Sequence, residues 1–406
     1  MHPHLRFAAT AAALPAMTLA ACGSSTSSSS GGGGSSRTFT LAVVGPMTGD
    51  AQADGLHIKQ GADLAAEEIN NSGGVASGPY AGAKIVIKTF DDTESVDKSV
   101  SIANQIASDD QYWAFLGTGF SDAAIATAPV LDRANVSYLS TYASSAKIIA
   151  TPRHSVFVVP PTFPAYAYSA ADRAYKLGYR KAAVLKANAG FGLQMADLFA
   201  EEFVRDGGEI VDNQPYTLGD KNTQGIVAHE VQQGPDVVAM AGLTGDDTTQ
   251  LKQLHDIAPN LPVIDTEAVL FSQNFLDLAG PLAEVAIGQT PSDPDRNTSA
   301  AKHLRDAFSA KYGTSIIPDP AAFTYEGVRA VAKALEAGPT DRTKLADALH
   351  NVDISDTGVG ELKFDTGGGR LGGILWYFHI KGGKFVFDTG YQQTAPLSVK
   401  EVPLQH

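Results

Sequence analysis

The chain has 406 residues, of which 44% are hydrophobic and 18% charged, so it can bury a sizeable core and by length suits two domains better than one. Its formal net charge is -14 at pH 7. No run of Lys and Arg forms the basic stripe that phosphate neutralisation requires, which argues against nucleic acid as a partner.

Residues 1–22 have the pattern of a secretion signal. A weakly basic start precedes an apolar stretch from Phe7 to Leu19, which is too short to span a bilayer stably, and Leu19-Ala20-Ala21-Cys22 follows. Cys22 is the sole cysteine of the sequence, so no intramolecular disulfide is possible. Its position resembles a bacterial lipobox, which predicts that Cys22 is lipidated; a buried core thiol is the disfavoured alternative.

Residues 23–36 are almost wholly Ser and Gly and predict a flexible tether. At roughly 5–6 Å × √n, such a tether reaches about 20 Å on average. Past Arg37 no apolar run is long enough to cross a bilayer. We therefore expect a folded body anchored by lipid on the outer face of the cell membrane.

Apolar strand patterns alternate with helical patterns along the body, which predicts βαβ units and a parallel sheet. The first series contains strands at 39–45, 83–90, 112–116 and 136–140, with helices at 61–69, 95–107 and after residue 121. Past residue 159 the series restarts, with helices at 166–177, 195–205 and 248–257 and strands at 182–185, 237–241 and 263–264. Helices at 301–312, 325–337 and 343–349 follow, and then a hairpin around residues 381–384. The fold class is α/β, with two doubly wound lobes.

Ser121 is the first candidate functional residue. The apolar run 112–116 stops at Gly117 and Gly119, and Ser121 then precedes an Ala/Ile-rich segment, as a strand, a turn and a helix would. Unpaired N–H groups at a helix N-terminus favour an anion, so we expect a carboxylate site. Two alternatives stay open: Ser121 only caps its helix, or it is a nucleophile in Gly119-Phe120-Ser121-Asp122-Ala123, which departs from Gly-x-Ser-x-Gly at its last place.

Other catalytic signatures are incomplete. His229-Glu230 begins like a zinc-protease helix, but Gln233 stands where the second histidine is needed. The spacing of Gly45 and Gly49 does not fit a dinucleotide fingerprint. We predict no metal, no cofactor and no enzymatic activity; a secreted serine hydrolase using Ser121 is the weaker alternative.

The motifs carry a family resemblance. Val44-Gly45-Pro46-Met47-Thr48-Gly49, then Gly61-Ala62, Ile69-Asn70 and Gly73-Gly74, resemble the opening of type I periplasmic solute-binding proteins, specifically the branched-chain amino-acid binding proteins of ABC importers. The resemblance runs from about residue 39 to residue 388. It implies two Rossmann-like lobes joined by three crossing segments, near residues 158–163, 288–294 and 370–373. Lobe 1 would comprise 37–158 and 294–371, and lobe 2 would comprise 159–293 and 372–406.

The resemblance also implies a ligand site. Ser121 and Ser144 would hold the α-carboxylate. Ser144 and the main chain near Tyr142 would also touch the α-ammonium, which Glu267 would neutralise, and the main chain of Ala143 would be a further backbone contact. The other residues expected to contact the ligand are Asp54, Phe191, Leu243 and Tyr325. Asp54 is a departure from the family's aromatic surroundings, and it either points to water or meets a polar or cationic group. Phe120 replaces a cysteine that forms a disulfide in some relatives.

These features predict a lipid-anchored, monomeric receptor that binds a small amino acid, branched-chain or similar, and delivers it to a membrane permease. An amide, urea or aromatic-acid receptor is the alternative within the same class.

Overall fold

The computed structural model describes residues 37–49, 51–291, 298–314, 316–371 and 375–388. Cys22, the signal peptide and the tether lie outside these ranges. Within them, no helix is long and apolar enough to cross a membrane.

The first lobe is built on a parallel sheet with strand order β2-β1-β3-β4-β5. Its strands are β1 (Thr38–Gly45), β2 (Lys84–Asp91), β3 (Tyr112–Gly117), β4 (Ser137–Ser140) and β5 (Val156–Val158). Alternate residues of β1 face opposite sides: Leu41 and Val43 join one buried cluster and Ala42 and Val44 another. Helices therefore cover both faces, which makes this lobe doubly wound.

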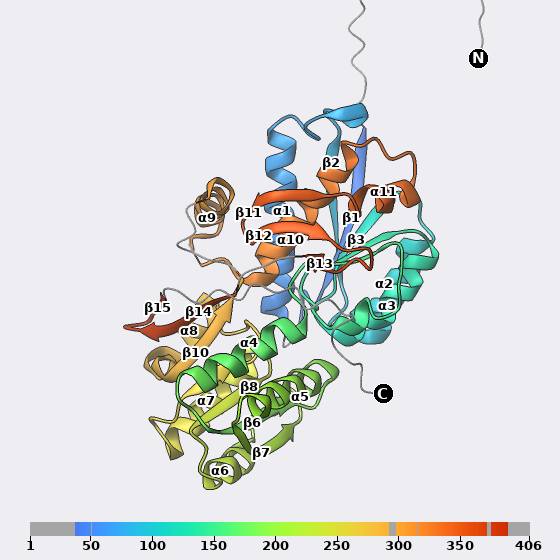
Figure 1. Cartoon of the computed structure of the whole chain (residues 1–406). Coiled ribbons are helices and arrows are strands. Elements are labelled where there is room, and N and C mark those ends of the chain that lie inside the picture. The colour runs from blue at the N-terminus through green and yellow to red at the C-terminus, as the bar shows by residue number, and fades with distance from the viewer. Residues whose placement is uncertain (1–36, 50, 292–297, 315, 372–374, 389–406) are drawn as a thin grey trace, which may run out of the picture. The chain divides into compact units, whose positions relative to one another are not determined.

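Segments far apart in the sequence meet on one face of that sheet. There α1 (Gln52–Asn71) lies beside α10 (Asp319–Leu335), with α11 (Arg342–Leu349) next to α10 (Figure 1). On the other face lie α2 (Val96–Ala107) and α3 (Ser121–Arg133). A small antiparallel sheet of β11 (Asp353–Thr357), β12 (Gly360–Phe364) and β13 (Arg370–Leu371) joins this lobe, as does α9 (Ser299–Tyr312).

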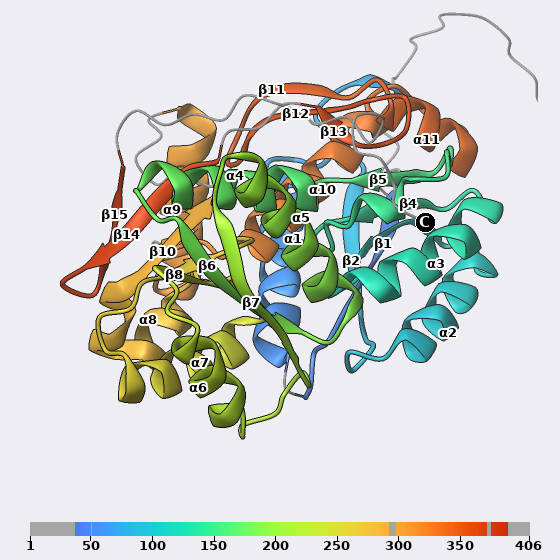
Figure 2. The ribbon, with the colours of Figure 1, turned by 60° about the horizontal axis from the view of Figure 1, so that its bottom comes forward.

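The second lobe repeats the plan. Its parallel strands have the order β7-β6-β8-β9-β10, which is the same sequence of neighbours as in the first lobe, and the antiparallel hairpin β14-β15 extends the β10 edge (Figure 2). The bounds are β6 (Lys181–Ala187), β7 (Glu209–Tyr216), β8 (Val237–Ala241), β9 (Val263–Asp265), β10 (Ala286–Thr290), β14 (Trp376–Lys381) and β15 (Lys384–Phe387). One face is covered by α4 (Phe163–Lys176) and α5 (Gly190–Arg205), and the other by α6 (Gln224–Gln232), α7 (Thr244–Ile257) and α8 (Gln273–Ala279).

The chain passes between the lobes three times: between β5 and α4, between β10 and α9, and between β13 and β14. The predicted α/β class with two doubly wound lobes and three crossings is confirmed. The exact residue limits drawn for the two lobes stay a prediction.

Several element boundaries differ from the sequence-based prediction. α1 begins at Gln52, whereas the sequence predicted a start near residue 61. The prediction missed its first turns because they are mostly polar and contain Gly55. A Cβ at Gly55 would lie 2.1 Å from the Pro46 carbonyl oxygen, so glycine lets the helix pack against the loop after β1. Strand β7 was missed because it is polar, half-buried and contains Pro215, as sheet edges do. The strands β10, β11 and β12 and the helices α6 and α8 were also missed.

Candidate functional site

The two sheets locate the candidate site. In each, the strand order reverses next to the first strand, between β1 and β3 and between β6 and β8. Doubly wound sheets bind ligands in the crevice outside the carboxyl ends of the strands at such a switch point. The helices α3, α5 and α7 begin there, directly after β3, β6 and β8.

These three helices have a common feature at their N-termini. Their N-cap residues are Phe120, Ala189 and Leu243, and none makes a side-chain capping bond. Some other helices are capped by side chains, for example α2 by Ser95 and α11 by Asp341, whereas α1, α4, α6 and α10 also lack a side-chain cap. The first N–H of α5, that of Gly190, donates to Asp122 Oδ2. At α3 and α7, N–H groups of the uncapped first turn are suited to donate to an anion in the crevice.

The structure brings together seven of the predicted site residues. They line a small void of about 20 Å³ and come from both lobes: Ser121, Tyr142, Ala143, Ser144, Phe191, Leu243 and Glu267. A cavity needs about 10–15 Å³ to hold one water molecule, so side chains leave only a little free space here.

Ser121 is the first residue of α3 and is 3% exposed. The N-cap position belongs to Phe120, and no side chain caps the helix, so the alternative that Ser121 serves only as a cap is wrong. Among the described residues its hydroxyl has no hydrogen-bond partner. A hydroxyl free at an uncapped helix N-terminus can donate to a carboxylate.

Ser144 and Glu267 form a direct contact between the lobes. The Ser144 hydroxyl donates to Glu267 Oε1 at 2.6 Å, and the backbone N–H of Glu267 donates to Asp265 Oδ1 at 2.9 Å. Burial raises the pKa of Glu267 to about 7, against the opposing effect of the Ser144 hydrogen bond, and the charges of Asp265 and Asp54 raise it further. A cation placed at Glu267 would reverse this shift.

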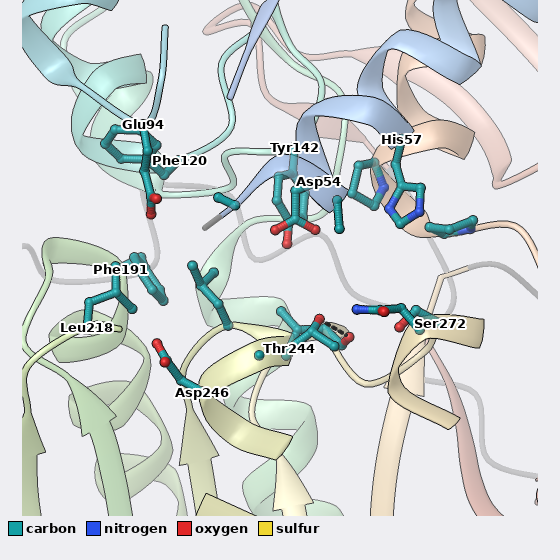
Figure 3. A pocket seen from close by; sticks show the side chains of 18 of the residues that line it. Asp54, His57, Glu94, Phe120, Tyr142, Phe191, Leu218, Thr244, Asp246 and Ser272 are labelled. Atoms are coloured by element: carbon teal, nitrogen blue, oxygen red, sulfur yellow. Dashed lines mark hydrogen bonds between the residues drawn. The ribbon is translucent and has the colours of Figure 1, made fainter. Parts of the chain in front are cut away.

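Beside the void lies a larger cavity of about 470 Å³, which shares Phe120, Tyr142, Phe191 and Leu243 with it. Figure 3 shows Asp54 and Glu94 pointing into this cavity from the first lobe, with residues of α5 and α7 facing them. A cavity of this size accommodates a small organic molecule.

Carboxyl groups that lie close together in and beside this cavity raise one another's pKa values. Burial raises the pKa of Asp54 to about 7, and the charge of Glu94 adds to the effect. The pKa of the Tyr142 hydroxyl is raised well above its usual range by burial and by the charges of Asp54 and Glu267. Tyr142 therefore lies within the field of both carboxyl groups. Burial lowers the pKa of His57 to about 4, so its ring is neutral near pH 7.

Tyr325 does not belong to this site, and its predicted contact with the ligand is wrong. Its hydroxyl donates to Glu68 Oε2 at 2.6 Å, and it lines a separate cavity of about 770 Å³ beside α9 and β11. The reason is that α10 begins at Asp319, six residues before Tyr325, so its first turn reaches the crevice instead.

Glu94, His57 and Asp246 line the cavity but were not singled out from the sequence. Each lies in a polar stretch that is typical of solvent-exposed loops or helix starts. Glu94 and its neighbour Thr93 have positive φ values of 59° and 49°. Residues other than glycine adopt this conformation rarely, and no local sequence motif predicted it.

Catalytic alternatives gain no support from the geometry. The described residues that line the void with Ser121 include no histidine. Among all the residues that the structure describes, no group of three or more His, Cys, Asp or Glu residues could hold a metal ion. The arrangement is suited to holding a molecule by charge and hydrogen bonds.

Comparisons with known proteins agree with this geometry. A family model described as periplasmic binding protein matches residues 38–384. The chain is 28% identical over 353 residues to Leu/Ile/Val-binding protein homolog 3 of Brucella melitensis, which covers 86% of this chain and 92% of that protein.

Two solved structures share the fold. The branched-chain amino acid transporter substrate binding protein LivJ from Streptococcus pneumoniae, in complex with isoleucine, matches with a TM-score of 0.79 at 20% identity, over 88% of this chain and 99% of that chain. A solute binding protein from R. palustris, in complex with benzoate, matches with a TM-score of 0.80 at 17% identity, over 90% and 100%. At these identities the likeness shows the fold.

Proposed function

This chain belongs to the periplasmic binding protein family, and on that premise we propose that it is the receptor of an ABC importer and binds a small α-amino acid, branched-chain or similar, between its lobes. As a member of that family it is an extracytoplasmic solute-binding protein and not an enzyme. The membrane permease of the importer is its proposed partner, and we propose that it acts as a monomer without a cofactor.

One observation carries the proposal. The free hydroxyl of Ser121, at an uncapped helix N-terminus, and the half-buried carboxyl group of Glu267 from the other lobe line one void. These groups complement the two charges of a zwitterion. The α-carboxylate would accept from Ser121, Ser144 and the main chain near Tyr142, and the α-ammonium would replace Ser144 as the main partner of Glu267.

The magnitudes are adequate. A hydrogen bond to a charged group contributes about 1.5–3 kcal/mol net. Several of them exceed the roughly 8 kcal/mol of a micromolar complex before ordering costs are subtracted.

Calorimetric titration of Glu267→Gln tests the proposal, after native mass spectrometry of the purified chain has identified any co-purified molecule. The variant keeps the shape but removes the charge, so binding of an α-amino acid should weaken by about 2 kcal/mol or more, roughly thirtyfold. Glu201→Gln is the matched control, because Glu201 is an exposed residue of α5 in the same lobe. If Glu267→Gln binds as tightly as the parent, the ligand has no amine there, and an amide, urea or aromatic acid becomes the better candidate.

We also propose that Cys22 is lipidated and anchors the protein to the outer face of the membrane. The support is its position as the sole cysteine after Leu19-Ala20-Ala21. Replacing Cys22 with Ala should move the protein from the membrane fraction to the soluble fraction. Retention of the Cys22→Ala protein in the membrane fraction would refute the lipid anchor.

A further inference from the structure

The larger cavity is the place where the side chain of a bound amino acid would lie. Glu267 and Ser121 line the void and not the cavity, whereas Asp54 lines the cavity and not the void. The two spaces share walls, so a molecule held at Glu267 by its α-ammonium extends directly into the cavity. The chemistry of the cavity therefore selects among side chains.

Negative groups dominate this cavity. Among the described lining residues, five carry carboxyl groups and one carries an ammonium: Asp54, Glu94, Asp122, Asp246, Asp319 and Lys221. The Lys221 ammonium is 3.6 Å from Asp246 Oδ1, so its charge is already engaged. His57 is neutral near pH 7 and supplies no compensating charge.

Asp54 differs from the other acids in lacking a partner. Asp122 accepts from the N–H of Gly190 at 3.2 Å, and Asp319 accepts from the Thr290 hydroxyl at 3.0 Å. Asp54 lies in the first turn of α1, and its carboxyl group makes no hydrogen bond or ion pair with any residue that the structure describes. Asp54 is half-buried, and removing a carboxylate from water without a partner costs free energy, which a cation supplied by a ligand would offset.

The walls suit the rest of such a side chain. Phe120, Phe191, Leu218 and Leu243 line the cavity together with the acids. Figure 3 shows Phe191 and Leu218 facing Asp54 and Glu94 across the space. Apolar walls with an acid at one end match the stem and the charged head of lysine or arginine. Aromatic faces add favourable contacts to a cation.

Resting on the proposed function, we propose that the amino acid bound by this chain has a cationic side chain whose charged end pairs with Asp54. An organic cation fits better than a metal ion, because no cluster in the described part of the chain provides three ligands. Asp54 is then a specificity-determining residue, and Glu267 remains the general anchor for the α-ammonium.

Calorimetric titrations of the full chain in mild detergent with L-arginine, L-lysine and L-leucine test this. The parent should bind arginine or lysine at least about thirtyfold more tightly than leucine. Asp54→Asn should reduce that affinity by about thirtyfold and change leucine binding by less than about threefold. Asp63→Asn is the matched control: it removes a carboxylate from the same helix, but one that pairs with Lys59 outside the cavity. It should leave all three affinities unchanged.

Three results would overturn the inference. If the parent binds leucine more tightly than both basic amino acids, the inference fails while the proposed function stands, and this comparison does not depend on the folding of any variant. If Asp54→Asn weakens leucine as much as arginine, Asp54 contacts the α-ammonium instead. If the parent binds none of the three and no other α-amino acid, the proposed function fails with it.

Discussion

At the scale of single residues, the site depends on carboxyl groups held where they ionise with difficulty. Glu267 and Asp54 both have a pKa of about 7, in each case mainly because of burial. A ligand ammonium favours the ionised form of an acid, so the complex has a lower carboxyl pKa than the free protein. Binding therefore releases protons when the pH lies below about 7.

The pH dependence of affinity follows from Glu267. As pH falls below about 7, its carboxyl group is increasingly protonated in the free protein, so affinity for an α-amino acid should fall by about tenfold per pH unit. Titrations at pH 5.5, 7.0 and 8.5, in buffers of different ionisation enthalpy, measure both the slope and the protons released. In the Glu267→Gln variant, the part of the pH dependence of affinity that comes from Glu267 should disappear. A flat affinity across this range would mean that the ligand makes no charge contact with Glu267.

At the scale of elements, the three helices α3, α5 and α7 begin at the crevice without side-chain caps. Phe120, Ala189 and Leu243 hold the N-cap positions of α3, α5 and α7, where a polar side chain would stabilise each helix by about 1 kcal/mol. The positions favour free N–H groups over local stability, as binding sites often do.

Ser121→Ala separates the two roles of this residue. Because the Ser121 side chain does not cap α3, the free energy of unfolding should change by less than about 0.5 kcal/mol, and the melting temperature should change little. Affinity for the amino acid should fall by about 1–2 kcal/mol, since the helix N-terminus still faces the carboxylate. Thermal melting and calorimetry of the same sample give both numbers. Ser95→Ala, which removes the cap of α2, is the control that should lower stability and leave binding intact. A destabilised Ser121→Ala protein with parental affinity would contradict this assignment.

The crossing near β13 depends on one buried arginine. The guanidinium of Arg370 donates to the carbonyl of Val359 at 2.6 Å, to that of Glu361 at 2.9 Å and to that of Val159 at 3.4 Å. It thereby ties the β11-β12-β13 sheet to the segment that leaves the first lobe.

Arg370→Ala should destabilise the protein by about 2–4 kcal/mol, because it leaves these buried carbonyl groups without their charged donor. Urea denaturation followed by circular dichroism measures the change in unfolding free energy. Arg133→Ala, at the exposed last residue of α3, is the comparison and should cost little. Equal stability of the Arg370→Ala protein and the parent would show that water replaces the guanidinium at this crossing.

At the scale of the whole molecule, several hydrogen bonds between described residues join the lobes at the crevice. Besides Ser144 to Glu267, the Ser145 hydroxyl donates to Gln194 Oε1 at 2.7 Å and the N–H of Gly190 donates to Asp122. The void of about 20 Å³ is too small for the α-amino and α-carboxylate groups of a ligand. We therefore expect the lobes to separate for the ligand to enter and to close again around it, with the three crossing segments as the hinge.

Small-angle X-ray scattering should therefore give a larger radius of gyration for the free protein than for the ligand-saturated protein. The closed form gains the ligand's charge contacts, so saturation shifts the population toward it. Glu267→Gln at the same ligand concentration should remain closer to the free value. An unchanged radius of the parent with binding demonstrated by calorimetry would show a rigid pocket and no hinge.

What the sequence determined by itself is the plan of the body. Alternating strand and helix patterns, each readable within about twenty residues, predict two parallel sheets, and the glycines before Ser121 predict that this residue begins a helix at a strand end. The hairpin around residues 381–384 was also predictable, because its turn is local. Such elements can be predicted from the sequence because they depend on contacts between near neighbours in the chain. The ligand-side roles of Ser121, Ser144 and Glu267 came from a resemblance, and they stay predictions.

Only the tertiary structure decided which polar groups meet. Ser144 and Glu267 are 123 residues apart and touch because the chain crosses between the lobes and returns. Asp54 reaches the cavity because α1 starts nine residues before its apolar stripe, where Gly55 allows close packing against Pro46. Tyr325 is directed away from the crevice because α10 starts at Asp319. Such pairings depend on how whole helices and sheets pack, and that packing leaves no signal at the single residues it brings together.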